Sequence, residues 1–297
     1  MKIRADKEYD HKSINSPFRW AGGKFYARKI IEAYIPHHQY YVEPFLGGGS
    51  VFFHKNKIDS WLNDYDKNLI NCYKHIQNNI DDLIEFLNGE TATKERHTFY
   101  KNEFKPQSLL EEAARYYYLN RTSYSGIMKE ANCYFGYGDK YSMRPENWGR
   151  QLTKNNKKLQ GVKLTSIDFE KVLDNIPNQK DNFVFLDPPY YNADQSKFYT
   201  KFFTLNDHER LSECLKKNQH KFKFLLTYDN SEEVRELYSW AHQVNEHEWN
   251  YVLARTDDQK LKKKLEDGFS SPRSKGKEIF ILNYDINEVV AQKKLNF

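Results

Sequence analysis

The stretch "YYVEPFLGGGSVFF", residues 40–53, decides the fold of this 297-residue chain. It opens with the aromatic and β-branched residues of a strand, continues through three glycines, and predicts a helix from near Ser50. The next stretch, "DSWLNDYDKNLINCYKHI" at residues 59–76, predicts a strand over residues 61–62 and a helix from about Asp66. Strand, glycine turn, helix, strand and acid follow one another as in nucleotide-binding βαβ units. The pattern therefore predicts an α/β fold.

The glycine turn indicates the kind of ligand. Glycines between a strand and a helix let a ligand approach the backbone, and the helix N-terminus offers free N–H groups to a carboxylate or phosphate. Neither the dinucleotide fingerprint GxGxxG nor the phosphate loop GxxxxGK[ST] is present, so we expect a nucleoside with an anionic tail. Asp64 follows Gly47 at about the spacing at which an acid binds ribose hydroxyls, with a helix-capping role as the alternative.

A second informative stretch is "FVFLDPPYYN", residues 183–192. Residues 183–186 are all apolar, as in a short strand buried on both faces. Pro188 and Pro189 lack backbone N–H donors and fix φ, so the chain leaves the sheet in a rigid, extended form. Asp187 is thereby held at the carboxyl end of a strand, where open α/β sheets bind ligands. An ordinary strand exit is the alternative for an Asp-Pro pair, but the full run favours a site.

Composition limits the class of protein. Hydrophobic residues make up 39% and charged residues 29%, which is typical of a soluble globular protein of one elaborate domain or two. No stretch has the length of a membrane-spanning helix and the N-terminus lacks an apolar export signal, so we expect a cytoplasmic protein without membrane contact. Three scattered cysteines without a CxxC pair predict neither disulfides nor a metal site. The net charge of +5 favours nucleic acid only slightly.

The middle of the chain interrupts the alternation of strands and helices. The segment over 71–159 is helical at first, with "LLEEAARYYYLNRTSYSGI" as its best helix, and loop-rich over 131–150. We therefore predict a catalytic domain from residues 16–70 and 160–297, with an inserted, mainly helical domain over 71–159. The remaining expected elements are helices over 24–34 and 231–241, strands at 162–169, 183–186, 221–230, 249–254 and 278–284, and a charged loop over 255–277.

Five motifs in this order resemble those of the Dam-like DNA adenine-N6 methyltransferases. They are "FRWAGGK" (18–24), "VEPFLGGGSVF" (42–52), "LNDYDKNLI" (62–70), "YYLNRTSYSGI" (117–127) and "FLDPPYYN" (185–192). The resemblance spans most of the chain, and the ordered set is far more specific than Asp-Pro-Pro-Tyr alone. It implies a Rossmann-like methyltransferase sheet with an inserted helical domain that recognises DNA. The implied activity is methyl transfer to the N6 amine of adenine in a short duplex DNA sequence.

The resemblance also implies S-adenosylmethionine as the methyl donor, without a metal. Carried over by position, Lys24 lies near the methionine carboxylate, Asp64 binds the ribose, and Asp168 lies beside the adenine. The whole implied cofactor site consists of Trp20, Lys24, Glu43, Phe45, Gly47, Gly49, Asp64, Asp168, Phe169 and Asp187. Two of these residues have structural alternatives, since Trp20 could be a core aromatic and Lys24 a solvated charge.

The implied catalytic loop consists of Asp187, Pro188, Pro189 and Tyr190. The adenine amine is a poor nucleophile because its lone pair is delocalised into the ring, so acceptors must stabilise the positive charge that develops on nitrogen. Asp187 and the Pro188 carbonyl are the implied acceptors, and the double proline holds both in place. Tyr190 stacks on the base, which must be flipped out of the duplex to be reached.

DNA recognition is expected in the inserted domain. The resemblance places Arg121 and Tyr124 at DNA-contacting positions, Arg for a guanine or phosphate contact and Tyr for a wedge into the base stack. A place in the core is the alternative for Tyr124, because the stretch "ARYYYLN" just before it is expected to be packed. Ser125, Ile127 and Lys129 lie beside them, where Dam itself has Asn, Leu and Arg, so a GATC target is left open. The expected partners are double-stranded DNA and a restriction endonuclease acting on the same site, in a bacterial or phage-infected cell.

Two other functions stay open at this point. The same fold and donor could serve cytosine N4, RNA or a protein glutamine, because amino-methyltransferases share the (D/N)PP(Y/F) loop. A catalytically silent DNA-binding protein is the second alternative, and its hallmark would be a broken glycine turn or a replaced Asp187, neither of which is seen. The order of the motifs and the stretch "NRTSYSGI" favour adenine in DNA.

Overall fold

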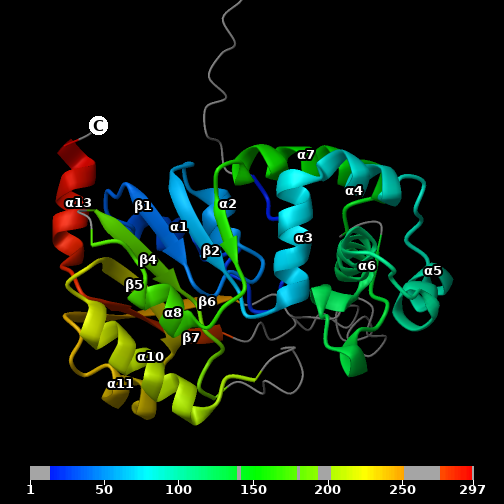
Figure 1. Cartoon of the computed structure of the whole chain (residues 1–297). Helices are drawn as coiled ribbons and strands as arrows, with labels where there is room; N and C mark the ends of the chain where they lie inside the picture. The colour runs from blue at the N-terminus through cyan, green and yellow to red at the C-terminus, as the bar shows by residue number, and fades with distance from the viewer. Residues whose placement is uncertain (1–13, 139–141, 179–180, 193–201, 251–274, 296–297) are drawn as a thin grey trace, which may run out of the picture.

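The computed structural model describes residues 14–138, 142–178, 181–192, 202–250 and 275–295, and its centre is a seven-stranded sheet (Figure 1). The strands lie in the order β3-β2-β1-β4-β5-β7-β6. Neighbouring strands are parallel, except that β7 is antiparallel to both β5 and β6. The bounds are β1 (Tyr40–Glu43), β2 (Asp59–Asn63), β3 (Lys163–Thr165), β4 (Asn182–Leu186), β5 (Lys223–Asp229), β6 (Gln243–Asn250) and β7 (Lys275–Leu282).

The order of the strands determines where a ligand can bind. From β1 the chain moves outward through β2 to β3, and β4 then pairs with the opposite side of β1. In open α/β sheets a crevice forms outside the carboxyl ends of the strands where the order reverses, which here is between β1 and β4. Val42 lies opposite Val184 in the parallel register, so both strands end at the same edge of the sheet. The predicted α/β architecture is confirmed.

Helices cover both faces of the sheet (Figure 1). Tyr41 and Phe183 belong to one hydrophobic core and Val42 and Val184 to the other, because successive residues of a strand point to opposite faces. The first core is covered by α1 (Arg28–Tyr34), α2 (Ser50–His54), α3 (Lys67–Asn78) and α13 (Ile286–Leu295), and the second by α8 (Phe169–Asp174), α10 (Leu205–Asn218) and α11 (Glu232–Leu237).

The segment between β2 and β3 is mainly helical, as predicted. Figure 1 shows α3 between the sheet and the group of helices beyond it, and α3 packs on α6 and α7. The predicted insertion start at residue 71 falls inside α3, and one continuous core joins the sheet, α3 and α6. The division into two domains therefore stays a prediction. The elements of this segment after α3 are α4 (Ile80–Leu87), α5 (Lys94–Thr98), a π-helix (Phe99–Glu103), α6 (Leu109–Thr122), short 3₁₀ turns (Tyr124–Gly126, Glu130–Asn132, Pro145–Asn147) and α7 (Trp148–Leu159).

Some helix predictions were wrong. α1 begins at Arg28 rather than at residue 24, because residues 24–27 form a turn that buries the Lys24 side chain. The stretch expected to be loop-rich up to residue 150 ends earlier, since α7 begins at Trp148. This helix buries Trp148, Leu152 and Leu159 on one face, a helical spacing that the sequence contains. The helices α8, α10 and α13 were not predicted.

The last two strands also differ from the prediction. β6 and β7 begin at Gln243 and Lys275, earlier than the expected starts at 249 and 278. Both form a long antiparallel ladder with each other, so backbone pairing extends the strands into polar sequence that apolar character does not reveal. Of the charged loop predicted over 255–277, the last three residues belong to β7, and the rest lies outside the described residues.

Candidate active site

A cavity of about 590 Å³ lies at the carboxyl ends of β1, β2 and β4. Its volume is within the range of about 300–1,000 Å³ that holds small-molecule ligands and cofactors. Pro188 is buried behind the lining. The structure brings together, on the wall of this cavity, the predicted residues Trp20, Lys24, Glu43, Phe45, Gly47, Gly49, Asp64, Asp168, Phe169, Asp187, Pro189 and Tyr190.

The glycine turn after β1 needs its glycines. Gly47 and Gly49 have φ values of +46° and +66°, in the left-handed region that L side chains rarely adopt. A Cβ at Gly47 would lie 2.7 Å from Nε1 of Trp20, so the indole packs directly on the turn. The Tyr73 hydroxyl donates to the Gly47 carbonyl at 3.1 Å. Trp20 is therefore part of the cavity wall and shapes the turn.

Asp64 ties the glycine turn to the end of β2. One of its carboxylate oxygens accepts from the Gly47 N–H at 2.8 Å, and the other accepts from the Asp66 N–H at 2.9 Å. Burial raises the pKa of Asp64 to about 6. The N-cap of α3 is Asp66 and not Asp64, because Asp66 accepts from the first free N–H groups of the helix. Asp64 thus combines a cavity position with a structural contact.

Aromatic rings form one wall of the cavity. The ring centroid of Phe45 lies 5.5 Å from that of Phe169 and 5.6 Å from that of Phe203. Phe203, which precedes α10, also lines the cavity and was not predicted. A wall of this kind suits a flat heterocyclic base. The predicted position of Phe169 beside an adenine is consistent with this wall.

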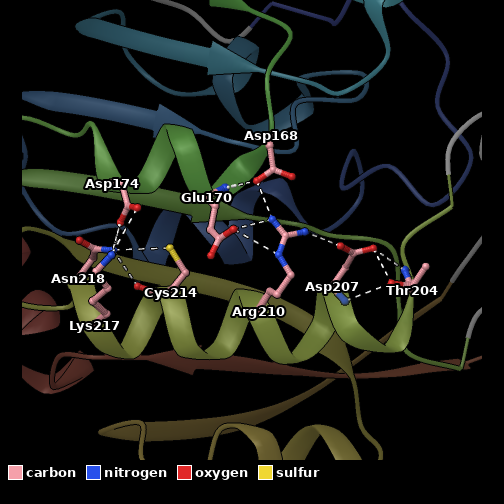
Figure 2. Close-up of polar contacts among 9 residues, drawn as sticks. All are labelled: Asp168, Glu170, Asp174, Thr204, Asp207, Arg210, Cys214, Lys217 and Asn218. Atoms are coloured by element: carbon pink, nitrogen blue, oxygen red, sulfur yellow. Dashed lines mark hydrogen bonds and ion pairs between the residues drawn. The ribbon is translucent and has the colours of Figure 1, made fainter.

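An arginine network holds the edge of that wall (Figure 2). Arg210 of α10 donates to Asp168 at 3.0 Å, to Glu170 at 2.6 Å and to Asp207 at 2.7 Å. The same Asp168 oxygen accepts from the Glu170 N–H at 2.9 Å, which makes Asp168 the N-cap of α8. The guanidinium also lies over the Phe169 ring, 4.9 Å from its centroid. Arg210 was not predicted because α10 itself was not.

Asp187 is fixed at the end of β4. Its Oδ1 accepts from the Thr227 hydroxyl at 2.8 Å and forms an ion pair with the Lys24 ammonium at 2.7 Å. None of the described residues donates to Oδ2, so this oxygen remains for a ligand. Thr227 was not predicted, although it lies on the strand expected over 221–230.

Lys24 lies at the centre of the site rather than on the surface. The residue is 4% exposed, and its ammonium donates to the Tyr190 hydroxyl at 2.6 Å as well as contacting Asp187. Glu278 of β7 lies 3.7 Å from the same ammonium. The solvated alternative for Lys24 is wrong, because the turn before α1 directs the side chain into the cavity.

Two further acids shape the site. Glu43, at the end of β1, is buried and accepts from the Tyr41 hydroxyl at 2.8 Å, and burial raises its pKa to about 8. Asp229, at the end of β5, accepts from the Tyr191 N–H at 2.8 Å and from the Asn192 side-chain amide at 3.1 Å. Asp229 thereby holds the loop that follows the two prolines. It was not predicted, although an acid at the end of an expected strand was a signal for it.

The residues predicted to contact DNA lie in different environments. Arg121 is only 7% exposed, and Ile127, which is 8% exposed, lines the cavity. Ser125 has a φ of +52°, in a tight turn whose Tyr124 N–H donates to the Tyr134 carbonyl at 2.9 Å. Lys129 is partly exposed, and its ammonium lies 4.8 Å from the centroid of the exposed Phe202 ring. The end of the turn, at Gly126 and Ile127, therefore lines the cavity, while Arg121 lies beneath the surface.

The described residues also bear on metal binding and on membrane insertion. Within them, no group of three or more His, Cys, Asp or Glu side chains has the arrangement of a metal site. No helix among the same residues combines the length and the apolar character needed to cross a membrane.

The sequence of this chain is similar to those of known proteins. A sequence profile described as D12 class N6 adenine-specific DNA methyltransferase matches residues 20–254. The chain is 28% identical over 290 residues to the type II methyltransferase M1.LlaDCHI of Lactococcus lactis subsp. cremoris, covering 90% of this chain and 95% of that one. It is 30% identical over 250 residues to the type II methyltransferase M.CviBI of Paramecium bursaria Chlorella virus NC1A, covering 79% and 91%. It is 29% identical over 210 residues to the DNA adenine methylase of Escherichia coli K12, covering 66% and 73%.

Proposed function

This chain belongs to the D12 class of N6 adenine-specific DNA methyltransferases, and from that premise we propose which of its residues perform the reaction. The enzyme methylates the N6 amine of adenine in DNA. Cytosine N4, RNA and protein glutamine are thereby set aside as targets, and so is a DNA-binding protein without turnover.

The residues of the glycine turn fit S-adenosylmethionine, the donor that the family implies. When bound, it supplies a methyl group attached to a positively charged sulfur. Asp64 would hold the ribose hydroxyls, and Phe45 and Phe169 would lie against the adenine ring. The missing Cβ at Gly47 leaves room for the Trp20 indole, and the two residues together form part of the cavity wall that the cofactor would contact. The remaining cofactor residues predicted from the sequence are kept in this proposal.

Asp187 accepts a hydrogen bond from the N6 amine of the target adenine. The nitrogen lone pair would form the new bond to the methyl carbon while the carbon–sulfur bond breaks and its electron pair stays on sulfur. Positive charge would thereby grow on nitrogen, which would afterwards release one proton to water. The observation that carries this role is the fixed carboxylate, whose Oδ1 is held by Thr227 and Lys24 while Oδ2 remains for the ligand. A preorganised acceptor of this kind needs no rearrangement as the charge develops. The Pro188 carbonyl is the proposed second acceptor.

The position of Asp187 supports base flipping. Its side chain is 19% exposed at the wall of the cavity, where a base stacked inside a duplex cannot reach it. We therefore propose that the adenine leaves the stack and packs against Tyr190, whose hydroxyl Lys24 holds at 2.6 Å. The turn at Tyr124–Gly126, whose last residue lines the cavity, would then lie beside the opened duplex.

The biological setting is proposed from the relatives. Two of them are named type II methyltransferases, which supports a restriction endonuclease acting on the same DNA site. Since the substrate is DNA, the cytoplasm of a bacterial or phage-infected cell is the proposed place of action.

The test of this function is the variant Asp187→Ala. We expect kcat to fall by about 10²–10³-fold or more, because a preorganised partner of the developing charge is removed. The variant should still fold and bind DNA with an affinity close to wild type, although its thermal midpoint should fall because the buried Lys24 loses the carboxylate that pairs with it. Asp82→Ala, which removes an exposed acid of α4, serves as the control and should leave the rate unchanged. A folded Asp187→Ala protein that methylates at the wild-type rate would contradict the proposal.

A further inference from the structure

β7 brings an acid into the active site that the reaction as described does not use. Glu278 is 1% exposed and lines the cavity, and its Oε1 lies 3.7 Å from the Lys24 ammonium. It comes from the antiparallel strand next to β5, far along the chain from the glycine turn and from the Asp187 loop. A buried carboxylate is costly unless a charge or hydrogen bond compensates it. Lys24 is that compensating charge.

Lys24 is shared between two carboxylates. Its ammonium contacts Asp187 at 2.7 Å and Glu278 at 3.7 Å, and it donates to the Tyr190 hydroxyl at 2.6 Å. With Lys24 and Asp187 alone, the cluster would be neutral and would place a positive charge beside the reacting amine. An ionised Glu278 makes the cluster net negative. Negative charge at this point favours the transition state, in which the amine becomes positive.

The other titratable groups around Glu278 are already engaged. Asp229 of β5 and His247 of β6 lie directly opposite Glu278 in the two strand ladders, so their side chains share its face of the sheet. Asp229 holds the backbone of Tyr191, and burial lowers the pKa of His247, which contacts the Tyr34 hydroxyl at 2.7 Å. His247 is therefore neutral near pH 7 and adds no charge to the cluster.

We propose that Glu278 is a positioning residue for methyl transfer, which in its ionised form holds the Lys24 ammonium against Asp187 and Tyr190 and offsets its charge. The proposal rests on the acceptor role of Asp187 given above. Glu278 does not touch the substrate, and its effect passes through Lys24.

The proposal implies a particular pH dependence. Burial raises the pKa of Glu278 to about 7, and the Asp187 charge adds to this while Lys24 opposes it. Because the ionised form is the active one, the methyl-transfer rate should rise as the pH increases through about 7. Glu43, whose raised pKa lies near 8, is a separate group at the end of β1, so a change caused by Glu43 would occur at higher pH.

The experiment is a pH profile of the single-turnover methylation rate. Wild type and Glu278→Gln are compared between pH 5.5 and 9, at saturating S-adenosylmethionine and saturating genomic DNA that lacks adenine methylation. We expect Glu278→Gln to be about 10–100-fold slower above pH 8, the size expected for one charge a few ångströms away, and to lose the rise near pH 7. The control is Glu288→Gln, an exposed acid of α13, which should reproduce the wild-type profile.

A rise near pH 7 that persists in a folded Glu278→Gln protein would overturn the proposal. If Glu278→Gln does not fold, Glu278→Asp takes its place as the test. This variant keeps the charge, so its methylation rate should be lower but should still rise with pH near 7. A methylation rate that does not change with pH in Glu278→Asp would refute the role of Glu278. These outcomes are separate from the failure of the proposed function, which would appear as wild-type activity in Asp187→Ala.

Discussion

The edge of the sheet and the helical segment between β2 and β3 bring their candidate functional residues into place by different physical means. At the sheet edge, predicted residues from the glycine turn, from Asp64 and from the Asp187 loop surround one cavity. In the helical segment, Arg121 is buried and Ile127 faces the cavity rather than the solvent. The difference has a physical cause. Parallel strands bring their carboxyl ends to one edge whatever their side chains are, whereas a helix exposes or buries a residue according to its packing partners.

This comparison predicts two kinds of variant. Substitutions at the sheet edge should impair cofactor binding or the chemical step, because the backbone there shapes the cavity. Substitutions in the helical segment should impair DNA binding and leave the methylation rate at saturating DNA unchanged.

The largest effect expected in this comparison is that of Gly47→Ala. The new Cβ would meet Trp20 at 2.7 Å in a backbone of positive φ, so the turn and its Asp64 bond must shift. We expect affinity for S-adenosylmethionine to fall by about a hundredfold, in line with a strain of about 1–3 kcal/mol together with the displaced indole. Calorimetric titration measures the loss.

Gly89→Ala is the matched control for Gly47→Ala. Gly89 also has a positive φ, +76°, but no heavy atom of the described residues lies within 4 Å of its Cβ position. This variant should lose about 1 kcal/mol of unfolding free energy from backbone strain and bind the cofactor normally. Equal cofactor affinities in the two variants would contradict the role given to the turn.

The helical segment is tested by Arg121→Met. None of the described residues accepts a hydrogen bond from the buried Arg121 Nε, and burial together with the Arg121 charge lowers the pKa of the half-buried Arg19. A buried arginine beside a second, half-buried one costs stability, so we expect Arg121→Met to keep or raise the unfolding free energy while weakening DNA binding by about 1–2 kcal/mol. Urea unfolding and fluorescence anisotropy measure the two quantities. A loss of DNA affinity matched by a loss of stability would show a purely structural arginine.

Lys129→Ala should give the smallest effect. This lysine is partly exposed beside Phe202, and the loss of one lysine–phosphate contact reduces the slope of log affinity against log salt concentration by about one. We expect about threefold weaker DNA binding at low salt. Binding isotherms at several salt concentrations measure the slope, and an unchanged slope would remove Lys129 from the DNA interface.

The sequence predicts those site residues that follow a local signal, and it misses those that reach the site through packing. The apolar run before Asp187 and the glycines after Glu43 are local signals, and the structure has β4 and β1 at these places. Glu278, Thr227 and Arg210 could not be found in this way, because each enters the site through packing with segments far away in the chain. α7 and α10 did carry usable signals. α7 has its helical apolar spacing, and α10 has the capping box of Thr204 and Asp207.

The central claim is that the sheet edge carries the chemical step and the helical segment carries DNA binding. The most direct test is the single-turnover methylation rate at saturating DNA and S-adenosylmethionine, measured for Asp187→Asn beside Lys129→Ala. We expect a rate at least about tenfold below wild type for Asp187→Asn, since an amide accepts the amine hydrogen bond less well than a carboxylate. Lys129→Ala should methylate at the wild-type rate. A wild-type rate for Asp187→Asn, or an equal slowing in both variants, would contradict the central claim.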